Sequence, residues 1–141
     1  MLALKDGLKA NEWVKTLSLT YCGLDAKAGR ALFEILIFQK SKLEDMILTG
    51  NQLRNEGAIT VLNGVSIAKT LKKIWLADNQ FNEAEDVLVA IKTCMQRNKE
   101  LAKYDFRNND LNDAGKYLTF LTLIAVIFFT EMLGPDTDEN G

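Results

Sequence analysis

The sequence contains an internal repeat of 28 to 30 residues, and this repeat restricts the possible folds more than any other feature of the chain. Four segments align, and each reads apolar-x-x-apolar-x-apolar-x-x-Asn/Cys-x-apolar. The segments begin at Val14, Leu43, Leu71 and Leu101, so that successive starts are 29, 28 and 30 residues apart. Four copies in one register indicate a structural unit that recurs along the chain and stacks on its neighbours.

Each unit is expected to contain a short strand. Leu17 and Leu19 flank Ser18, and this alternation of period two predicts one buried and one exposed face. The corresponding residues of the later units are 46–48, 74–76 and 104–106. Since strands this short are not stable singly, we expect them to pair into one parallel sheet. The sheet would align Leu17, Met46, Ile74 and Tyr104 in a single row.

The ninth position of each unit is expected to form a structural column. Asn51, Asn79 and Asn109 occupy this position in the last three units, and Cys22 occupies it in the first. An amide side chain both donates and accepts hydrogen bonds, so such a column can satisfy backbone groups in the turns. For Cys22 we expect a small buried thiol rather than a reactive one.

The second half of each unit is expected to be a helix, because apolar residues recur there at spacings of three and four. These residues are Leu32, Phe33, Ile35, Leu36 and Phe38, then Ile59, Val61, Leu62 and Val65, then Val87, Leu88, Ile91 and Cys94. Residues 1–13, with Leu4, Leu8 and Trp13, are interpreted as the partial helix of a preceding repeat.

These repeats resemble the leucine-rich-repeat family, and within it the ribonuclease-inhibitor-like subclass. That subclass has repeats of this length, with a glycine shortly after the consensus core. Gly57 and Gly115 match that glycine, whereas Ala28 and Glu85 stand at the equivalent positions of the other two units. The resemblance covers residues 2–121. It implies an α/β leucine-rich-repeat solenoid, with a curved parallel sheet on the concave side, helices on the convex side, and a protein-binding role.

The expected organisation is a partial helix over residues 1–13, four repeats over 14–133, and an acidic tail over 134–141. The last part of the repeat region, residues 117–133, is expected to be a hydrophobic helix. Its uncharged stretch of 14 residues (117–130) is shorter than the roughly 20 residues that a membrane-spanning helix needs, which favours a buried helix. The alternatives are a membrane-associated helix and a splicing artefact.

The acidic tail resembles the start of a calcium-binding loop. Asp136, Asp138 and Asn140, followed by Gly141, match positions 1, 3, 5 and 6 of an EF-hand loop. The sequence lacks the ligands of positions 7 and 12, so we expect no metal site in the chain as it stands. The alternatives are a severed EF-hand loop and a frayed acidic tail.

The composition excludes several classes of function. The chain has 17 basic and 19 acidic residues, so it lacks the basic surplus that is usual in nucleic-acid-binding proteins. It has no histidine, which excludes histidine-based triads and histidine-ligated zinc. Two cysteines without a CxxC motif, and no visible secretion signal, predict a cytoplasmic protein with free thiols. We therefore expect no enzymatic activity, no cofactor and no nucleic-acid partner.

The side chains between the consensus apolar positions are expected to face the concave side of the sheet. Ile47 and Trp75 are large, apolar and adjacent in the predicted stack, and charges of both signs surround them. Exposed aromatic residues with a charged rim are typical of protein-binding hot spots. The predicted binding surface consists of Asp45, Ile47, Lys73, Trp75, Lys103, Asp105 and Arg107. The alternative for Trp75 is that its ring folds over neighbouring residues.

The leading functional prediction is a non-enzymatic scaffold that binds a partner protein through this concave surface. One alternative is a regulator of a small GTPase, similar to the Ran activators of the same family, in which Arg54 or Arg107 would act in trans. Another is a fragment of a calcium-responsive protein that combines these repeats with an EF-hand.

Overall fold

Strands of three residues alternate with helices along the chain in the computed structural model, which describes residues 1–9 and 11–111. In this part of the chain the elements form an α/β fold. In order they are α1 (Leu2–Lys9), β1 (Thr16–Ser18), α2 (Ala28–Leu36), β2 (Asp45–Ile47), α3 (Arg54–Ile67), β3 (Lys73–Trp75), α4 (Glu85–Arg97) and β4 (Lys103–Asp105).

The four strands pair in sequence order, β1-β2-β3-β4, into one parallel sheet. Leu17 pairs with Met46, Met46 with Ile74, and Ile74 with Tyr104, which confirms the predicted row. Each strand begins one residue earlier than the sequence pattern predicted. Backbone hydrogen bonds between neighbouring repeats also continue past the strand ends, for example from Tyr21 N to the Thr49 carbonyl at 2.9 Å.

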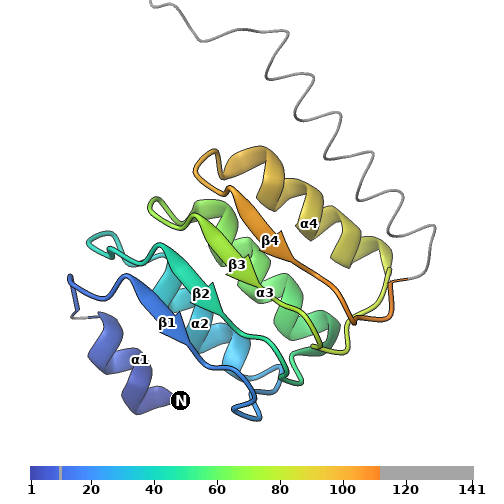
Figure 1. The fold of residues 1–141 in the computed structure, drawn as a ribbon, viewed down its shortest axis with the longest axis horizontal. Helices are drawn as coiled ribbons and strands as arrows, with labels where there is room; N and C mark the ends of the chain where they lie inside the picture. Colours follow the sequence, from blue (N-terminus) through green and yellow to red (C-terminus); the bar gives the residue numbers. More distant parts are fainter. Residues whose placement is uncertain (10, 112–141) are drawn as a thin grey trace, which may run out of the picture.

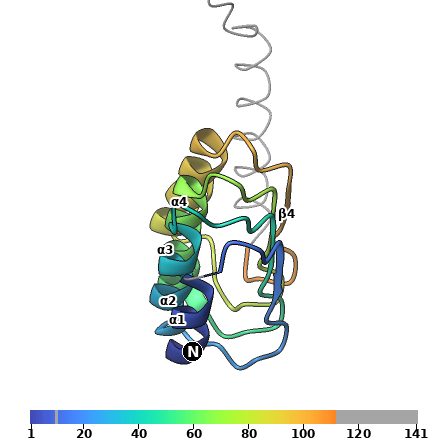
Figure 2. The same ribbon diagram turned by 90° about the vertical axis from the view of Figure 1, so that its left-hand side faces the viewer.

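Helices and strands form two layers. All four described helices lie on one side of the sheet, side by side in sequence order, and the strands form the other layer (Figures 1 and 2). We call the sheet face that points away from these helices the open face. No described helix covers this face.

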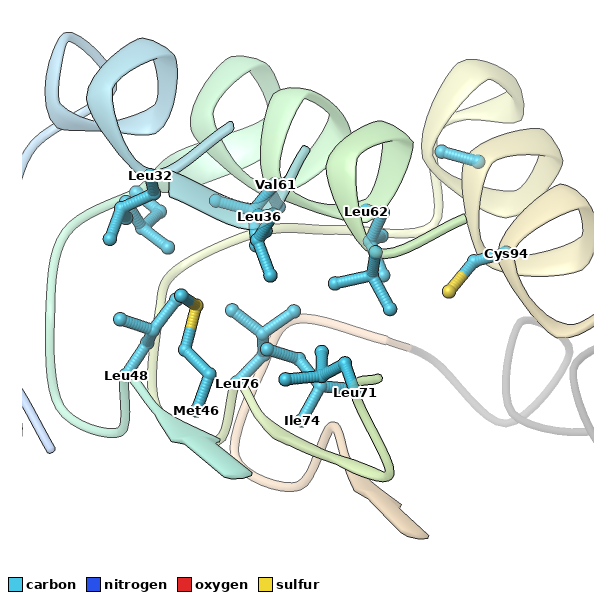
Figure 3. Close-up of a cluster of buried hydrophobic side chains, with 14 of the residues drawn as sticks. Leu32, Leu36, Met46, Leu48, Val61, Leu62, Leu71, Ile74, Leu76 and Cys94 are labelled. Atoms are coloured by element: carbon cyan, nitrogen blue, oxygen red, sulfur yellow. The ribbon is translucent and has the colours of Figure 1, made fainter. Parts of the chain in front are cut away.

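The hydrophobic core lies between the two layers (Figure 3). The consensus apolar residues Met46, Leu48, Ile74 and Leu76 are fully buried and point towards the helices. Burying one such side chain contributes about 1.5–3 kcal/mol relative to leaving it in water. The repeat pattern therefore reflects one continuous core that successive units share.

Glycines allow helices α2 and α3 to approach closely. A Cβ atom built on Gly29 would lie 3.1 Å from the Cα of Gly57. A Cβ atom on Gly57 would lie 3.0 Å from the Cα of Ala26, and one on Gly64 would lie 3.0 Å from Leu36 Cδ1. The glycine on which the family resemblance partly rests thus lies at a close contact with the preceding repeat.

The N-terminal helix is shorter than residues 1–13. Helix α1 ends at Lys9, and Asn11 Oδ1 accepts hydrogen bonds from the backbone N–H groups of Trp13 and Val14, both at 2.8 Å. This turn directs the chain into β1 and leaves the Trp13 side chain 86% exposed. Similarly, Phe38 lies beyond the end of α2, so it belongs to the following connection and not to the helix.

Ion pairs hold α1 against α2. The Nζ atoms of Lys5 and Lys9 each lie 3.2 Å from Glu34 Oε2. Their hydrogen bonds hold the pKa of Glu34 below its usual value. Because α1 contributes no fully buried residue, these ion pairs and the partly buried Leu8 carry its attachment.

Two sequence predictions concern residues outside the described part of the chain. These are the hydrophobic helix of residues 117–133 and the candidate calcium ligands Asp136, Asp138 and Asn140. Within the described residues, no helix has the length and apolar character needed to cross a membrane. No group of three or more acidic or cysteine side chains there could hold a metal ion.

Candidate interaction surface

The sheet brings the predicted binding residues onto three adjacent strands of the open face. Asp45 pairs with Lys73, and Lys73 with Lys103, at the starts of the strands. One step further along, the register continues from Ile47 to Trp75 and on to Asp105. Arg107 lies two residues after the end of β4. All seven predicted residues therefore lie on these three adjacent strands or directly after them.

Trp75 is half-buried and is held by a hydrogen bond. Its Nε1–H donates to Asp45 Oδ1 at 2.8 Å, so the bond joins β3 to the neighbouring strand β2. The other oxygen of Asp45 lies 3.9 Å from Lys73 Nζ. The predicted exposure of Trp75 and Ile47 was wrong, since both are of intermediate burial. The indole leans over the neighbouring strand, as in the alternative interpretation, and its position is thereby fixed.

Asp105 and Arg107 form a bidentate ion pair. Arg107 Nε donates to Asp105 Oδ1 at 2.9 Å, and Arg107 Nη2 donates to Oδ2 at 2.7 Å. The Arg107 guanidinium holds the pKa of Asp105 below its usual range, and the carboxylate in turn raises the pKa of Arg107. Asp105 is only 8% exposed, so it supports Arg107 rather than serving as a freely accessible charge.

A hollow of about 400 Å³ opens on this face at the carboxyl ends of the strands. It is lined by Tyr21, Thr49, Trp75, Ala77, Asp78, Asp105, Arg107 and Asn108. We call it the open-face hollow. It includes Trp75, Asp105 and Arg107 of the predicted surface, whereas Asp45, Ile47, Lys73 and Lys103 are not among its lining residues.

Tyr21, Asp78 and Asn108 also belong to this surface, although the sequence pattern did not predict them. All three have left-handed backbones, with φ of 51°, 55° and 55°, and Gly50 has a φ of 74° at the equivalent position of the second repeat. Each of the four residues directly precedes the Asn/Cys column. Gly, Asn and Asp are the residues that adopt this conformation most readily, so their recurrence was a usable signal for a turn at the rim.

The predicted asparagine column forms. Asn51 Oδ1 accepts the backbone N–H groups of Cys22 and Leu24, while its Nδ2 donates to the carbonyls of Leu19 and Leu48. The Asn109 side chain makes equivalent contacts to the third repeat, including one from Asn79 N at 2.9 Å. The column links successive turns and so holds the rim of the hollow.

The prediction that Cys22 is buried was wrong, because its side chain is exposed and its Sγ lies 3.5 Å from the Thr20 carbonyl. Cys22 lies in the turn that follows β1, the edge strand of the described sheet, and no described repeat covers the outer side of that turn. The other free thiol, Cys94, is buried in α4, and this burial raises its pKa to about 12.

A second, larger hollow of about 600 Å³ lies on the helix layer between α3 and α4. It is lined by Ile59, Asn63, Glu85, Asp86, Val89, Ala90 and Thr93. The lining of this hollow contains no aromatic ring. The open-face hollow is therefore the better candidate for specific recognition.

Comparison with known proteins adds no family assignment. No protein-family model matches the sequence, and no curated protein matches it significantly.

Proposed function

We propose that the chain is a leucine-rich-repeat protein whose units form a solenoid, with the open face as its concave side. The 28–30-residue period, the parallel pairing of successive strands and the asparagine column support this proposal. The placement of the described helices on one side of the sheet is what such a solenoid requires.

We further propose that the protein is a non-enzymatic scaffold that binds a partner protein through the open face. The observation that carries this proposal is the position of Trp75. Its ring lines the open-face hollow, and its N–H is held by Asp45. An aromatic side chain that is fixed before binding loses little conformational freedom in the complex, which is characteristic of interface hot spots.

The alternative role as a small-GTPase regulator has less support. Arg107 is paired to Asp105 through two guanidinium nitrogens, which does not favour its use as a free arginine in trans. The other candidate, Arg54, is the exposed first residue of α3, and it does not line the open-face hollow.

The proposal is tested with a partner purified on the immobilised full chain. The dissociation constant of that partner is measured by calorimetry for the wild type, for Trp75→Ala, and for Val89→Ala as a control. Val89 is a 55% exposed apolar residue on the opposite layer. We expect Trp75→Ala to weaken binding by about tenfold or more, as hot-spot truncation does, and Val89→Ala to leave it unchanged.

Circular dichroism melting is measured for both variants, so that unfolding is distinguished from lost recognition. A folded Trp75→Ala variant that binds the partner as tightly as the wild type would contradict the proposed function.

A further inference from the structure

We infer that the open-face hollow accepts a lysine or arginine side chain of the partner protein. This inference rests on the proposed function, and it adds the chemical class of the group that the surface recognises.

The charges around the hollow leave one uncompensated negative group. The charged residues in its lining are Asp78, Asp105 and Arg107, and the last two neutralise each other in their bidentate pair. The Asp78 carboxylate is exposed and makes no ion pair or hydrogen bond within residues 1–9 and 11–111. Lys73 and Lys103 lie at the opposite ends of their strands and do not line the hollow.

Two aromatic side chains line the same hollow. Tyr21 is 71% exposed, and its ring lies so close to Gly50 that a Cβ atom there would overlap it. Trp75 is positioned by its hydrogen bond to Asp45. The faces of Tyr and Trp rings attract cations, because the ring quadrupole places negative charge there.

These groups together suit a long side chain with a positive end. Its aliphatic stem would pack on the rings, and its charge would lie near Asp78. The volume of about 400 Å³ falls in the range of about 300–1,000 Å³ that is usual for sites of small ligands. An acidic side chain would instead be repelled by Asp78, and the three charged lining residues carry a net negative charge with Arg107 held by Asp105, which favours basic partners.

The full chain offers an internal control for a direct test by NMR. Trp75 lines the hollow, whereas Trp13 is 86% exposed elsewhere, and each has one indole N–H signal. The ¹⁵N-labelled protein is titrated with N-acetyl-arginine amide, N-acetyl-lysine amide and N-acetyl-glutamate amide. We expect the two basic probes to shift the Trp75 signal in a saturable way, with no change at Trp13 and none with the glutamate probe.

The role of the carboxylate is tested with Asp78→Asn. Asparagine tolerates the left-handed backbone at this position, so the fold should be retained. We expect the variant to bind the arginine probe about two- to fivefold more weakly, which corresponds to the loss of one exposed ion pair. Asp6→Asn, which removes the same charge on α1, should leave probe binding unchanged.

The cation site would be disproved by an unshifted Trp75 signal, by an equal response to the glutamate probe, or by unchanged binding in Asp78→Asn. The two proposals fail differently when the partner itself is used. If Trp75→Ala abolishes partner binding and Asp78→Asn has no effect, the cation site is wrong and the scaffold role stands. If Trp75→Ala has no effect on the partner, the scaffold role is wrong, and the probe titration alone decides whether the hollow binds cations.

Discussion

Asn79 is completely buried, yet only the nitrogen of its side-chain amide has hydrogen-bond partners within the described residues. Its Nδ2 group donates to the carbonyls of Leu48, Leu76 and Ala77, whereas its Oδ1 atom has no partner within the described residues. The Oδ1 atoms of Asn51 and Asn109 each accept two backbone N–H groups. The donors of Asn79 therefore account for its contribution to stability.

Replacing Asn79 by alanine should strongly destabilise the fold. The Leu48, Leu76 and Ala77 carbonyls would each lose one hydrogen bond while keeping a second donor, and one such bond contributes about 0.5–1.5 kcal/mol net. We expect the free energy of unfolding in urea to fall by about 2–4 kcal/mol. Asn63→Ala, at an exposed position of α3, should change it by less than about 0.5 kcal/mol. Equal effects of the two substitutions would show that the column is not a stabilising element.

Single residues of the site differ in how far the sequence predicted them. The asparagine column was predicted because its amide groups have an evident use at a turn. The sequence did not predict that Asp105 is buried, because this depends on its side-chain ion pair with Arg107. The half-buried state of Trp75 likewise depends on a side-chain hydrogen bond, in this case to Asp45. Cys22 was predicted wrongly because the repeat pattern does not distinguish an edge position from an interior one.

At the scale of elements, apolar periodicity was sufficient to place strands and helices. The period of two predicted all four strands to within one residue, and the spacings of three and four predicted α2, α3 and α4. The pattern did not predict the early end of α1, where the Asn11 side chain forms a turn that competes with the helix.

Gly57 and Gly7 differ in the space around them and therefore give opposite expectations. Alanine at Gly57 would place its Cβ 3.0 Å from Ala26 Cα and from Leu53 Cβ, so backbone would have to move. We expect a net loss of about 1–2 kcal/mol in the free energy of unfolding, because overpacking outweighs the gain in helix propensity.

Gly7 lies in α1 with no atom within 4 Å of the corresponding Cβ position. Gly7→Ala should therefore stabilise the protein by up to about 0.5–1 kcal/mol. Thermal melts of the two variants should shift in opposite directions. A Gly57→Ala variant that melts at or above the wild-type temperature would show that the helices can separate without cost.

At the scale of the whole molecule, contacts join each repeat mainly to the next one. Strands pair with the following strand, and helices pack on the following helix, α1 on α2, α2 on α3 and α3 on α4. Stability in such an array depends on how many neighbours a unit has. The repeated sequence pattern predicted this arrangement. The open-face hollow could be found only from coordinates, because it combines residues from separate repeats.

Amide hydrogen exchange should follow this neighbour dependence. Helix α3 and strands β2 and β3 have described repeats on both sides, whereas α1 contains no buried residue. We expect the slowest exchange at buried positions of α3 such as Val61, Leu62 and Val65, and exchange in α1 that is at least about a hundredfold faster, a difference of about 2.7 kcal/mol. Uniform exchange across the elements would show that the fold opens only as a whole.

The unequal lengths of the repeats have a consequence for how such a chain tolerates genetic change. Paired residues of β1 to β4 are separated by 29, 28 and 30 residues, yet they remain directly opposite one another. The differences are absorbed between the strands, where the helices range from 9 to 14 residues. Codons gained or lost there would leave the strands aligned, so the helix side of the protein can change in length over generations while the open face keeps its register.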